Sequence, residues 1–410
     1  MNQMLKIAIL LALAANLVGC KPNEWPPVPE PPVAQSPVIW KKGLERSGLT
    51  STPHYFRGNI IFGHPAKETN QYLVYCLNAE TGDSIWKTRI VTSNEFSPFD
   101  INDSHLFGNK IIFSRSKRFF VIDADNGSVL WKYEDPINYN GISIIDDYIY
   151  LADQVLRETS TMYRFDLNTG VKEELFTIRH GKDEPGGDFT PSLLMPVKWL
   201  HPNGDEILVL QNRSYAYDRL GPDGMYGYSK MDLMAYNLTA DSILWYRYEV
   251  DNFSSNVASP VIDGNKVYFY GDRHAYCINP LNGETRWKYF IGDGPEDDFN
   301  TANILIIGDK LIVKPDNDAM HAVNKETGER IWLNENTASM PGLLTVHQDT
   351  IWFSSGGVLA IDANTGKTLI DQYKASNGSW IFPVAHHPTN GTIFTSDATG
   401  FYCLNPKCMK

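Results

Sequence analysis

One short phrase recurs along this chain and constrains its fold more than any other feature. It reads hydrophobic–x–Asp/Asn–x–x–Thr/Asn–Gly–x–x–x–Trp, and its seven copies place the Asp or Asn at Asn78, Asp123, Asp166, Asn237, Asn279, Asn324 and Asp362. The gaps between successive Gly positions are 45, 43, 71, 42, 45 and 38 residues. A period near 40 residues, with four short strands per repeat, is typical of a β-propeller in which each repeat forms one blade.

The phrase describes a tight turn followed by a strand. An Asp or Asn side chain can bond to its own backbone in a turn, and Gly accepts a positive φ without steric cost. Three copies depart from the pattern: Asp241 stands in place of Gly, while Glu174 and Ile370 stand in place of Trp. We therefore expect a hairpin between the third and fourth strands of each blade, with the Trp position on the fourth strand.

The two ends of the chain supply the halves of an eighth copy. Residues 401–405 match residues 275–279, but the chain stops before the Trp, and residues 38–41 provide the missing Val-Ile-Trp-Lys. A propeller avoids an open sheet edge when an N-terminal strand completes the last blade. The sequence thus predicts an all-β fold over residues 38–410, with eight four-stranded antiparallel blades closed by the N-terminal strand.

Most of the tryptophans occupy one repeat position. Of the ten in the chain, six do so: Trp40, Trp86, Trp131, Trp245, Trp287 and Trp332. An indole has a large apolar area that suits packing between neighbouring blades. We interpret these six residues as structural blade-docking residues rather than as a platform for a ligand.

The repeat resembles that of a known family. Residues 323–332, Val-Asn-Lys-Glu-Thr-Gly-Glu-Arg-Ile-Trp, and residues 361–366, Ile-Asp-Ala-Asn-Thr-Gly, are similar to the repeat of the pyrroloquinoline-quinone-type (PQQ-like) propellers. The resemblance covers nearly all of residues 36–410. The family contains quinoprotein dehydrogenases and also non-enzymatic lipoproteins, such as the propeller subunit of the outer-membrane β-barrel assembly machine. The resemblance is specific for the fold and leaves the activity open.

Residues 1–19 have the pattern of a lipoprotein signal peptide. Lys6 precedes an apolar run over residues 7–15 that is too short to span a membrane, and residues 17–20, Leu-Val-Gly-Cys, resemble a bacterial lipobox. Cleavage before Cys20 would leave that cysteine to carry lipid; the alternative is an ordinary signal peptide with a chance cysteine. By resemblance to well-studied two-membrane bacteria, Lys21 after the cysteine favours the outer membrane.

The lipidated Cys20 and the residues up to Pro37 form the predicted tether. Residues 21–37 contain seven prolines, which favour extended polyproline II geometry and a semi-rigid spacer. A proline-motif ligand is the alternative. The formal net charge of −12, without a basic block, argues against nucleic acid as a partner and against direct binding to anionic lipid.

The 71-residue gap marks an insertion in the fourth blade, within about residues 180–230. It falls in two places, around 180–191 and 211–230, and both should emerge on the face that carries the blade-to-blade connections. Tyr, Arg and Met are enriched at protein interfaces. The partner-binding candidates are Arg213, Tyr215, Tyr217, Arg219, Met225, Tyr226 and Tyr228. The alternative is an extended β-hairpin whose tyrosines pack only on one another.

No motif for catalysis or metal binding is evident, so we predict neither a cofactor nor a metal. The chain has no Cys-Cys pair, which many quinoprotein relatives carry, and the acidic runs at 293–298 and 316–318 lack an EF-hand loop. His386-His387 beside a turn reads as a surface feature. Cys76, Cys277 and Cys403 share one repeat position and should be buried, while a Cys403–Cys408 bridge and a ligand or calcium ion in the central funnel stay open.

These features favour a non-enzymatic, membrane-anchored envelope scaffold that binds other proteins through one propeller face, with outer-membrane protein assembly as one such role. Its partners would be envelope proteins, including an outer-membrane assembly complex. The alternative is a quinone- or carbohydrate-binding propeller that acts as a dehydrogenase-like enzyme or a sensor. The sequence does not distinguish the periplasmic from the outer side of the membrane.

Overall fold

The chain divides into two units, residues 1–36 and residues 37–410. The structure is a computed structural model that describes residues 36–45, 50–67, 71–91, 104–115, 118–134, 141–153, 159–179, 190–220, 226–252, 258–271, 273–292, 303–315, 318–338, 343–377 and 383–409. The lipoprotein signal, Cys20 and the tether up to residue 35 lie outside these residues.

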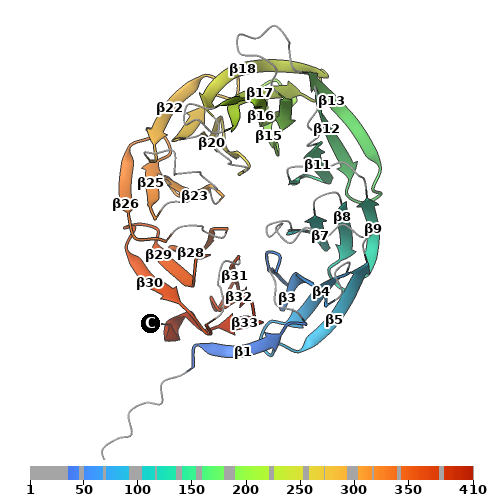
Figure 1. Ribbon diagram of the computed structural model, residues 1–410, viewed down its shortest axis with the longest axis vertical. Coiled ribbons are helices and arrows are strands. Elements are labelled where there is room, and N and C mark those ends of the chain that lie inside the picture. Colours follow the sequence, from blue (N-terminus) through green and yellow to red (C-terminus); the bar gives the residue numbers. More distant parts are fainter. Residues whose placement is uncertain are drawn as a thin grey trace, which may run out of the picture. The chain divides into compact units, whose positions relative to one another are not determined.

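Residues 37–410 form a ring of eight antiparallel sheets, which are the eight predicted blades (Figure 1). The first strand of each blade lies nearest the centre of the ring, and the fourth strand forms its rim. Blade 1 contains β2 (His54–Phe56), β3 (Asn59–Pro65), β4 (Gln71–Asn78) and β5 (Ser84–Val91). Blade 2 contains β6 (Ser104–Phe107), β7 (Lys110–Arg115), β8 (Arg118–Asp123) and β9 (Val129–Glu134). Blade 3 contains β10 (Ser143–Ile145), β11 (Tyr148–Ala152), β12 (Thr159–Asp166) and β13 (Lys172–Arg179).

The remaining blades follow in chain order. Blades 4 to 6 contain β14 (Thr190–Leu193), β15 (Val197–Leu200), β16 (Glu206–Leu220), β17 (Tyr226–Asn237), β18 (Ser242–Asn252); β19 (Val261–Asp263), β20 (Lys266–Tyr270), β21 (His274–Ile278), β22 (Thr285–Phe290); and β23 (Leu305–Ile307), β24 (Lys310–Val313), β25 (Met320–Asn324), β26 (Arg330–Asn334). Blades 7 and 8 contain β27 (Thr345–His347), β28 (Thr350–Ser354), β29 (Val358–Asp362), β30 (Thr368–Tyr373); and β31 (Ala385–His386), β32 (Ile393–Asp397), β33 (Gly400–Leu404), β1 (Val38–Gly43).

Blade 8 joins the two ends of the propeller, as the sequence predicts. Strand β1 pairs antiparallel with β33, so that Trp40 lies opposite Cys403 and Lys41 opposite Tyr402 (Figure 1). The amide of Asn405 donates to the carbonyl of Pro37 at 2.7 Å. The predicted eight-bladed ring closed by the N-terminal strand is therefore confirmed. A single 3-10 turn, Pro406–Cys408, follows β33.

The turns between third and fourth strands follow the predicted chemistry. The six turn glycines have φ between 69° and 77°, and Asp241, at the seventh position, has φ of 51°. In the last of these turns, Oδ1 of Asp362 accepts from the amides of Asn364 at 2.9 Å and Thr365 at 2.8 Å. Because neighbouring strands in each blade are antiparallel, these turns lie on the face of the ring opposite the connections between blades.

The core is distributed between adjacent blades rather than gathered in one place. Each apolar cluster joins two sheets; for example, Ile61 and Val74 of blade 1 pack with Ile111 and Ile122 of blade 2. Cys76, Cys277 and Cys403 are buried in such clusters, and burial raises the pKa of each thiol to about 12. Cys403 and Cys408 are not joined by a disulfide, so the bridge that the sequence left open is not formed.

Blade 4 differs from the simple four-strand plan. Its innermost strand is split into β14 and β15, and both segments pair with the long strand β16. The break falls at residues 194–196, where Pro196 lacks a donor for the ladder. Strands β16 and β17 extend the sheet well beyond the length of the corresponding strands in other blades.

Candidate protein-binding site

Six blade interfaces share one contact between a tryptophan and a turn glycine. The indole of each blade-docking residue lies against the turn glycine of the next blade, so that an added Cβ would meet an indole carbon at 2.5–2.9 Å. The pairs are Trp40 with Gly82, Trp86 with Gly127, Trp131 with Gly170, Trp245 with Gly283, Trp287 with Gly328 and Trp332 with Gly366. The turn glycine is thus needed both for its positive φ and for the space its missing side chain leaves.

Five of these indoles also donate a hydrogen bond across the interface. In each case Nε1 donates, at 2.7–3.1 Å, to the carbonyl of the residue that follows the turn Asp or Asn. The acceptors are Ala79, Leu167, Pro280, Lys325 and Ala363. Nε1 of Trp86 has no hydrogen-bond partner among the described residues. The contribution of the six tryptophans to stability stays a prediction.

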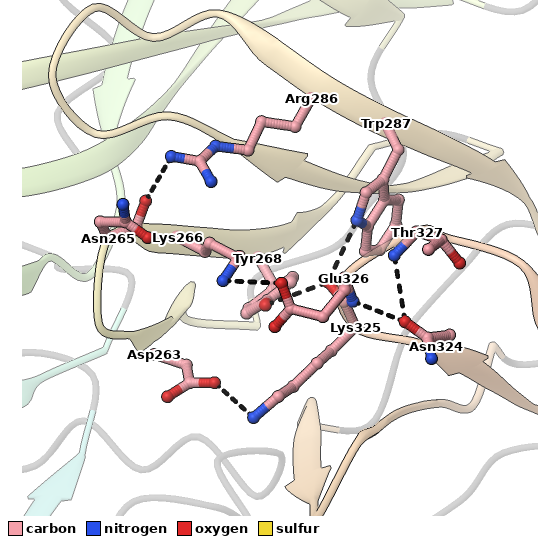
Figure 2. A network of polar contacts seen from close by, with 10 residues as sticks. All are labelled: Asp263, Asn265, Lys266, Tyr268, Arg286, Trp287, Asn324, Lys325, Glu326 and Thr327. Atoms are coloured by element: carbon pink, nitrogen blue, oxygen red, sulfur yellow. Dashed lines mark hydrogen bonds and ion pairs between the residues drawn. The ribbon is translucent and has the colours of Figure 1, made fainter.

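Figure 2 shows this contact between blades 5 and 6, where charged side chains surround it. The carbonyl of Lys325 accepts from Nε1 of Trp287 and from the hydroxyl of Tyr268, both at 3.1 Å. Two ion pairs cross the same interface: Lys325 to Asp263 at 2.6 Å and Lys266 to Glu326 at 2.9 Å (Figure 2). The two lysines and the two carboxylates pair with one another, so these turn residues join blade 5 to blade 6.

The interface between blades 3 and 4 replaces the tryptophan and the glycine together. Glu174 stands at the Trp position of blade 3, and Asp241 stands at the Gly position of blade 4. Phe176 instead stacks on Tyr236 with ring centroids 4.0 Å apart, and the Tyr236 hydroxyl donates to Oδ1 of Asp241. Burial, helped by the Asp241 carboxylate, raises the pKa of Tyr236 to about 12.

Beside this altered interface, β16 and β17 form a long hairpin on the face of the blade connections. Their pairing runs from Ile207 with Asn237 out to Leu220 with Tyr226, with an irregularity after Ala216. The insertion is therefore an extended hairpin, and whether its tyrosines pack only on one another stays untested. The partner-binding candidates Tyr215, Tyr217 and Arg219 lie on β16, and Tyr226 and Tyr228 lie on β17.

The candidates differ in how much of them is described. Arg213 is half-buried at the root of the hairpin. The side chains of residues 214–229 and all of Met225 lie outside the described part of the structure, as does the insertion at 180–189. The strands bring the five tyrosine and arginine positions beyond Arg213 onto one ribbon. Whether their side chains bind a partner stays a prediction.

A buried polar network fixes the root of the hairpin. Asn212 Nδ2 donates to the Tyr246 hydroxyl at 2.9 Å and to Asp232 Oδ2 at 3.3 Å, and the Tyr246 hydroxyl donates to the same carboxylate at 2.8 Å. The amide of Ser192 on β14 donates to Oδ1 of Asn212 at 3.0 Å. Four strands of blade 4 are therefore held together by three side chains, each with its polar atoms engaged.

The same root is joined to both neighbouring blades. Gln211 Nε2 donates to the Tyr270 carbonyl of blade 5 at 2.8 Å, and the Leu193 amide donates to the Ser160 hydroxyl of blade 3 at 3.1 Å. At the end of β18, Asp251 accepts from the Tyr276 hydroxyl of blade 5 at 2.8 Å. Buried hydrogen bonds of this kind position an element firmly, since an unmade bond in a buried site is costly.

The sequence reasoning missed this network. Asn212 and Asp232 interrupt apolar strand runs, after Leu210 and between Met231 and Leu233, and that interruption was the only signal of a buried polar pair. Tyr246 follows Trp245 at a position where four other blades carry lysine. A polar residue in a strand reads as solvent-facing unless its partner across the sheet is known.

The structure offers no assembled metal centre in the part of the chain that it describes. No group of three or more His, Cys, Asp or Glu residues there is placed to hold a metal ion. The acidic runs at 293–298 and 316–317 lie outside that part, although Asp318 lies within it. Among the described residues, no helix is long and apolar enough to cross a membrane.

The fold and repeats define an eight-bladed β-propeller with PQQ-like repeats. Within it, residues 202–372 match the family model described as outer membrane protein assembly factor BamB. The resemblance seen in the sequence is confirmed by this match and by the fold. The matched segment includes both long strands of the blade-4 hairpin. No curated protein matches the chain.

Solved structures share the fold at low sequence identity. BamB from Moraxella catarrhalis is 12% identical, with 90% of this chain and 96% of that chain covered and a TM-score of 0.55. A europium-containing methanol dehydrogenase is 11% identical, with 89% and 85% covered and a TM-score of 0.61. Saccharomyces cerevisiae Sqt1 is 11% identical, with 90% and 99% covered and a TM-score of 0.59. At such identity these structures support the fold alone.

Proposed function

We propose that this protein is a non-enzymatic, membrane-anchored envelope scaffold that binds other proteins through the blade-4 hairpin, in outer-membrane protein assembly. The observation that carries the proposal is the hairpin itself, which projects from a rigid ring on a buried polar root. An isolated two-stranded ribbon is only marginally stable in water, and binding residues are often found on loops held by a rigid scaffold. The match of residues 202–372 to the BamB family model supports the same role.

The test replaces residues 218–228 with a short Asn-Gly turn and follows crosslinking in the native envelope. The described root, including Asn212 and Asp232, is left intact, so the ring should fold with an unchanged melting temperature. A photo-crosslinker at Tyr217 in the unaltered hairpin should capture an envelope protein. A crosslinker on the rim of blade 4, at Tyr248, should lose that partner when the hairpin is shortened.

The matched control is Lys367→Glu, an exposed charge reversal in a turn on the opposite face. It should leave the crosslinks unchanged. Lys325 is unsuitable as a control because its ion pair with Asp263 joins blades 5 and 6. If the shortened protein keeps every crosslink while Lys367→Glu loses them, the turn face carries the contacts and the hairpin does not.

The membrane anchor is tested separately at Cys20, which lies outside the described residues. Cys20→Ser should abolish the incorporation of labelled palmitate and release the protein from the membrane fraction, because stable anchoring needs acyl chains on that cysteine. A mature N-terminus other than Cys20 in the unaltered protein would contradict the proposal. The alternative of a dehydrogenase is supported by similarity of fold alone. Dye reduction with added quinone and calcium tests it.

A further inference from the structure

Blade 8 meets blade 7 without the contact that fastens six other interfaces. Ile370 stands at the Trp position of blade 7. On the facing side, the third and fourth strands of blade 8 come from opposite ends of the chain, so no turn between them supplies a glycine. The nearest equivalent is Gly391 in the turn between β31 and β32, where an added Cβ would lie 2.9 Å from Nε2 of His347. The interface is instead an apolar cluster that contains Trp352 and Ile370 of blade 7 and Val384 and Tyr402 of blade 8.

Two histidines meet at the inner end of this interface. His347 of β27 and His386 of β31 stack with ring centroids 5.5 Å apart and ring planes 17° apart. Nε2 of His386 lies 3.0 Å from the Thr345 hydroxyl, and its ring lies 5.6 Å from that of Trp352. His386 is therefore part of the blade interface, not the surface feature that its sequence context suggests.

The surroundings of His386 favour its neutral form. Burial, with a smaller repulsion from His347, lowers the pKa of His386 to about 3. Its Nδ1 is buried and has no hydrogen-bond partner among the described residues. From β27 the facing titratable group is His347, from β28 the neighbour is the uncharged Trp352, and no described carboxylate contributes to its electrostatics. A positive charge added here would be buried without an opposite charge.

The neighbouring groups on blade 8 face other ways. His387 lies against blade 1, with Nε2 3.2 Å from the Tyr55 hydroxyl and ring centroids 4.7 Å apart. The buried carboxylate of Asp397 accepts from the Ser376 hydroxyl after blade 7, and the amides of Thr399 and Gly400 also donate to it, at 2.7 and 2.8 Å. Neither group neutralises a charge on His386.

We propose that the interface between blades 7 and 8 is an acid-sensitive seam, at which protonation of His386 parts the two blades and opens the ring. Blade 8 stays attached to blade 1 through the indole of Trp40 on Gly82 and the stacking of Phe62 on Phe401, whose ring centroids are 3.8 Å apart. The seam is separate from the blade-4 hairpin and does not depend on its function.

The interface between blades 1 and 2 shows why histidines alone do not make a seam. His54 there lies 3.0 Å from the Ser104 hydroxyl, next to His105. That interface is fastened by Trp86 on Gly127 and by the ion pair of Arg57 with Asp125 at 2.9 Å. The interface between blades 7 and 8 combines a partly buried histidine with the absence, among its described residues, of both a tryptophan–glycine contact and an ion pair.

The expected size of the effect follows from proton linkage. With a pKa of about 3 in the closed ring and 6.5 when exposed, protonation of His386 favours the open form about 30-fold more at pH 5 than at neutral pH. Above pH 7.5, His386 is almost entirely neutral in both forms, so protonation no longer favours the open ring. Acidification by two to three pH units is therefore enough to be measured.

The test uses thiols as reporters of separate interfaces in the full chain. Ile370→Cys places a thiol in the cluster between blades 7 and 8, while the native Cys76, Cys277 and Cys403 are buried between blades 1 and 2, 5 and 6, and 8 and 1. Labelling with a pyridyl disulfide, which reacts at acid pH, is followed peptide by peptide at pH 7.5 and 5. Rates are normalised to those of free cysteine at each pH.

The introduced thiol at position 370 should react about 30-fold faster at pH 5, with Cys277 and Cys76 unchanged. His386→Gln should remove the acceleration, and His201→Gln, in an exposed turn of blade 4, should retain it. His347→Gln serves as a second variant should His386→Gln fold poorly, and it should weaken the acceleration. Equal acceleration at all four thiols, none at position 370, or acceleration that survives both seam variants would overturn the proposal.

Discussion

At the scale of single residues, each repeat packs on the next because the turn glycine has no side chain and the indole of a tryptophan fills the space. Gly328 has φ of 75°, and a Cβ there would lie 2.7 Å from an indole carbon of Trp287. The same relation recurs at six interfaces, and it is absent between blades 3 and 4, where Glu174 and Asp241 stand at the two repeat positions. The tryptophan and the glycine therefore form one unit, although they lie about 40 residues apart in the chain.

This coupling predicts the outcome of a double-mutant cycle. Trp287→Ala should cost about 3–5 kcal/mol of unfolding free energy, the range for a buried large aromatic residue. Gly328→Ala should cost more than the ~1–2 kcal/mol of backbone strain, because the methyl group also displaces the indole. In the double variant that extra cost should vanish. Urea denaturation monitored by circular dichroism measures all three.

Gly58→Ala is the matched control for that cycle. Gly58 has φ of 84° but nothing within 4 Å of an added Cβ, so its substitution reports backbone strain alone. If Gly328→Ala costs no more than Gly58→Ala, the glycine is required only for its turn conformation, and the indole is not confined by it.

At the scale of elements, the strand order and the closure could be predicted because the repeated phrase fixes the position of each turn. The split of the inner strand of blade 4 could not, since the break depends on how Pro196 meets β16. The hairpin network could not be predicted either. Asn212, Asp232 and Tyr246 lie far apart in the chain, and only the register of three strands brings their side chains together.

Glu174 and Asp241 depart from the repeat, but the sequence does not reveal what the two departures do to the interface between blades 3 and 4. Each was visible as an exception to the repeat. That the two exceptions face each other, and that Phe176 and Tyr236 replace them, depends on which face of a strand meets which turn. The hairpin candidates remain untested for the same reason, because their strand positions alone do not reveal what they contact.

Strand β1 should be needed for the stability of the whole propeller. Deletion of residues 36–43 should lower the melting temperature of the whole propeller, because β33 loses its edge partner and Gly82 loses the indole of Trp40. Deletion of residues 21–34, within the tether, should leave the melting temperature unchanged. Differential scanning calorimetry compares both with the mature chain. Equal melting temperatures for the two truncations would show that β1 does not close the ring.

At the scale of the whole molecule, partly or fully buried histidines set the response of stability to acid. Burial lowers the pKa of His54, His105 and His321 to about 4 from the usual 6.5. The unfolded chain therefore binds more protons between pH 6.5 and 4, and folding is favoured by these groups above pH 6.5. The carboxylates whose pKa is lowered, such as Asp397, act only below their usual value of 3.8.

The free energy of unfolding should therefore be constant between about pH 7 and 8 and fall as the pH decreases from 6.5 to 4. His105→Gln should make this decline shallower without changing the slope below pH 4, where carboxylates dominate. Urea denaturation at half-unit pH intervals measures the curve. His201→Gln, in the turn after β15, serves as control and should reproduce the parent curve, and a parent curve that is flat down to pH 4 would contradict the prediction.

The pairing of β1 with β33 also determines when the propeller can be finished. The first strand to be synthesised must wait for the last, across more than 350 residues of intervening chain, from Trp40 to Cys403. Closing so long a loop is entropically costly and slow, and folds dominated by such distant pairings form late. Blades 1 to 7 can each assemble from local hairpins as the chain emerges. The eighth cannot, so ring closure has to wait until β33 is available to pair with β1.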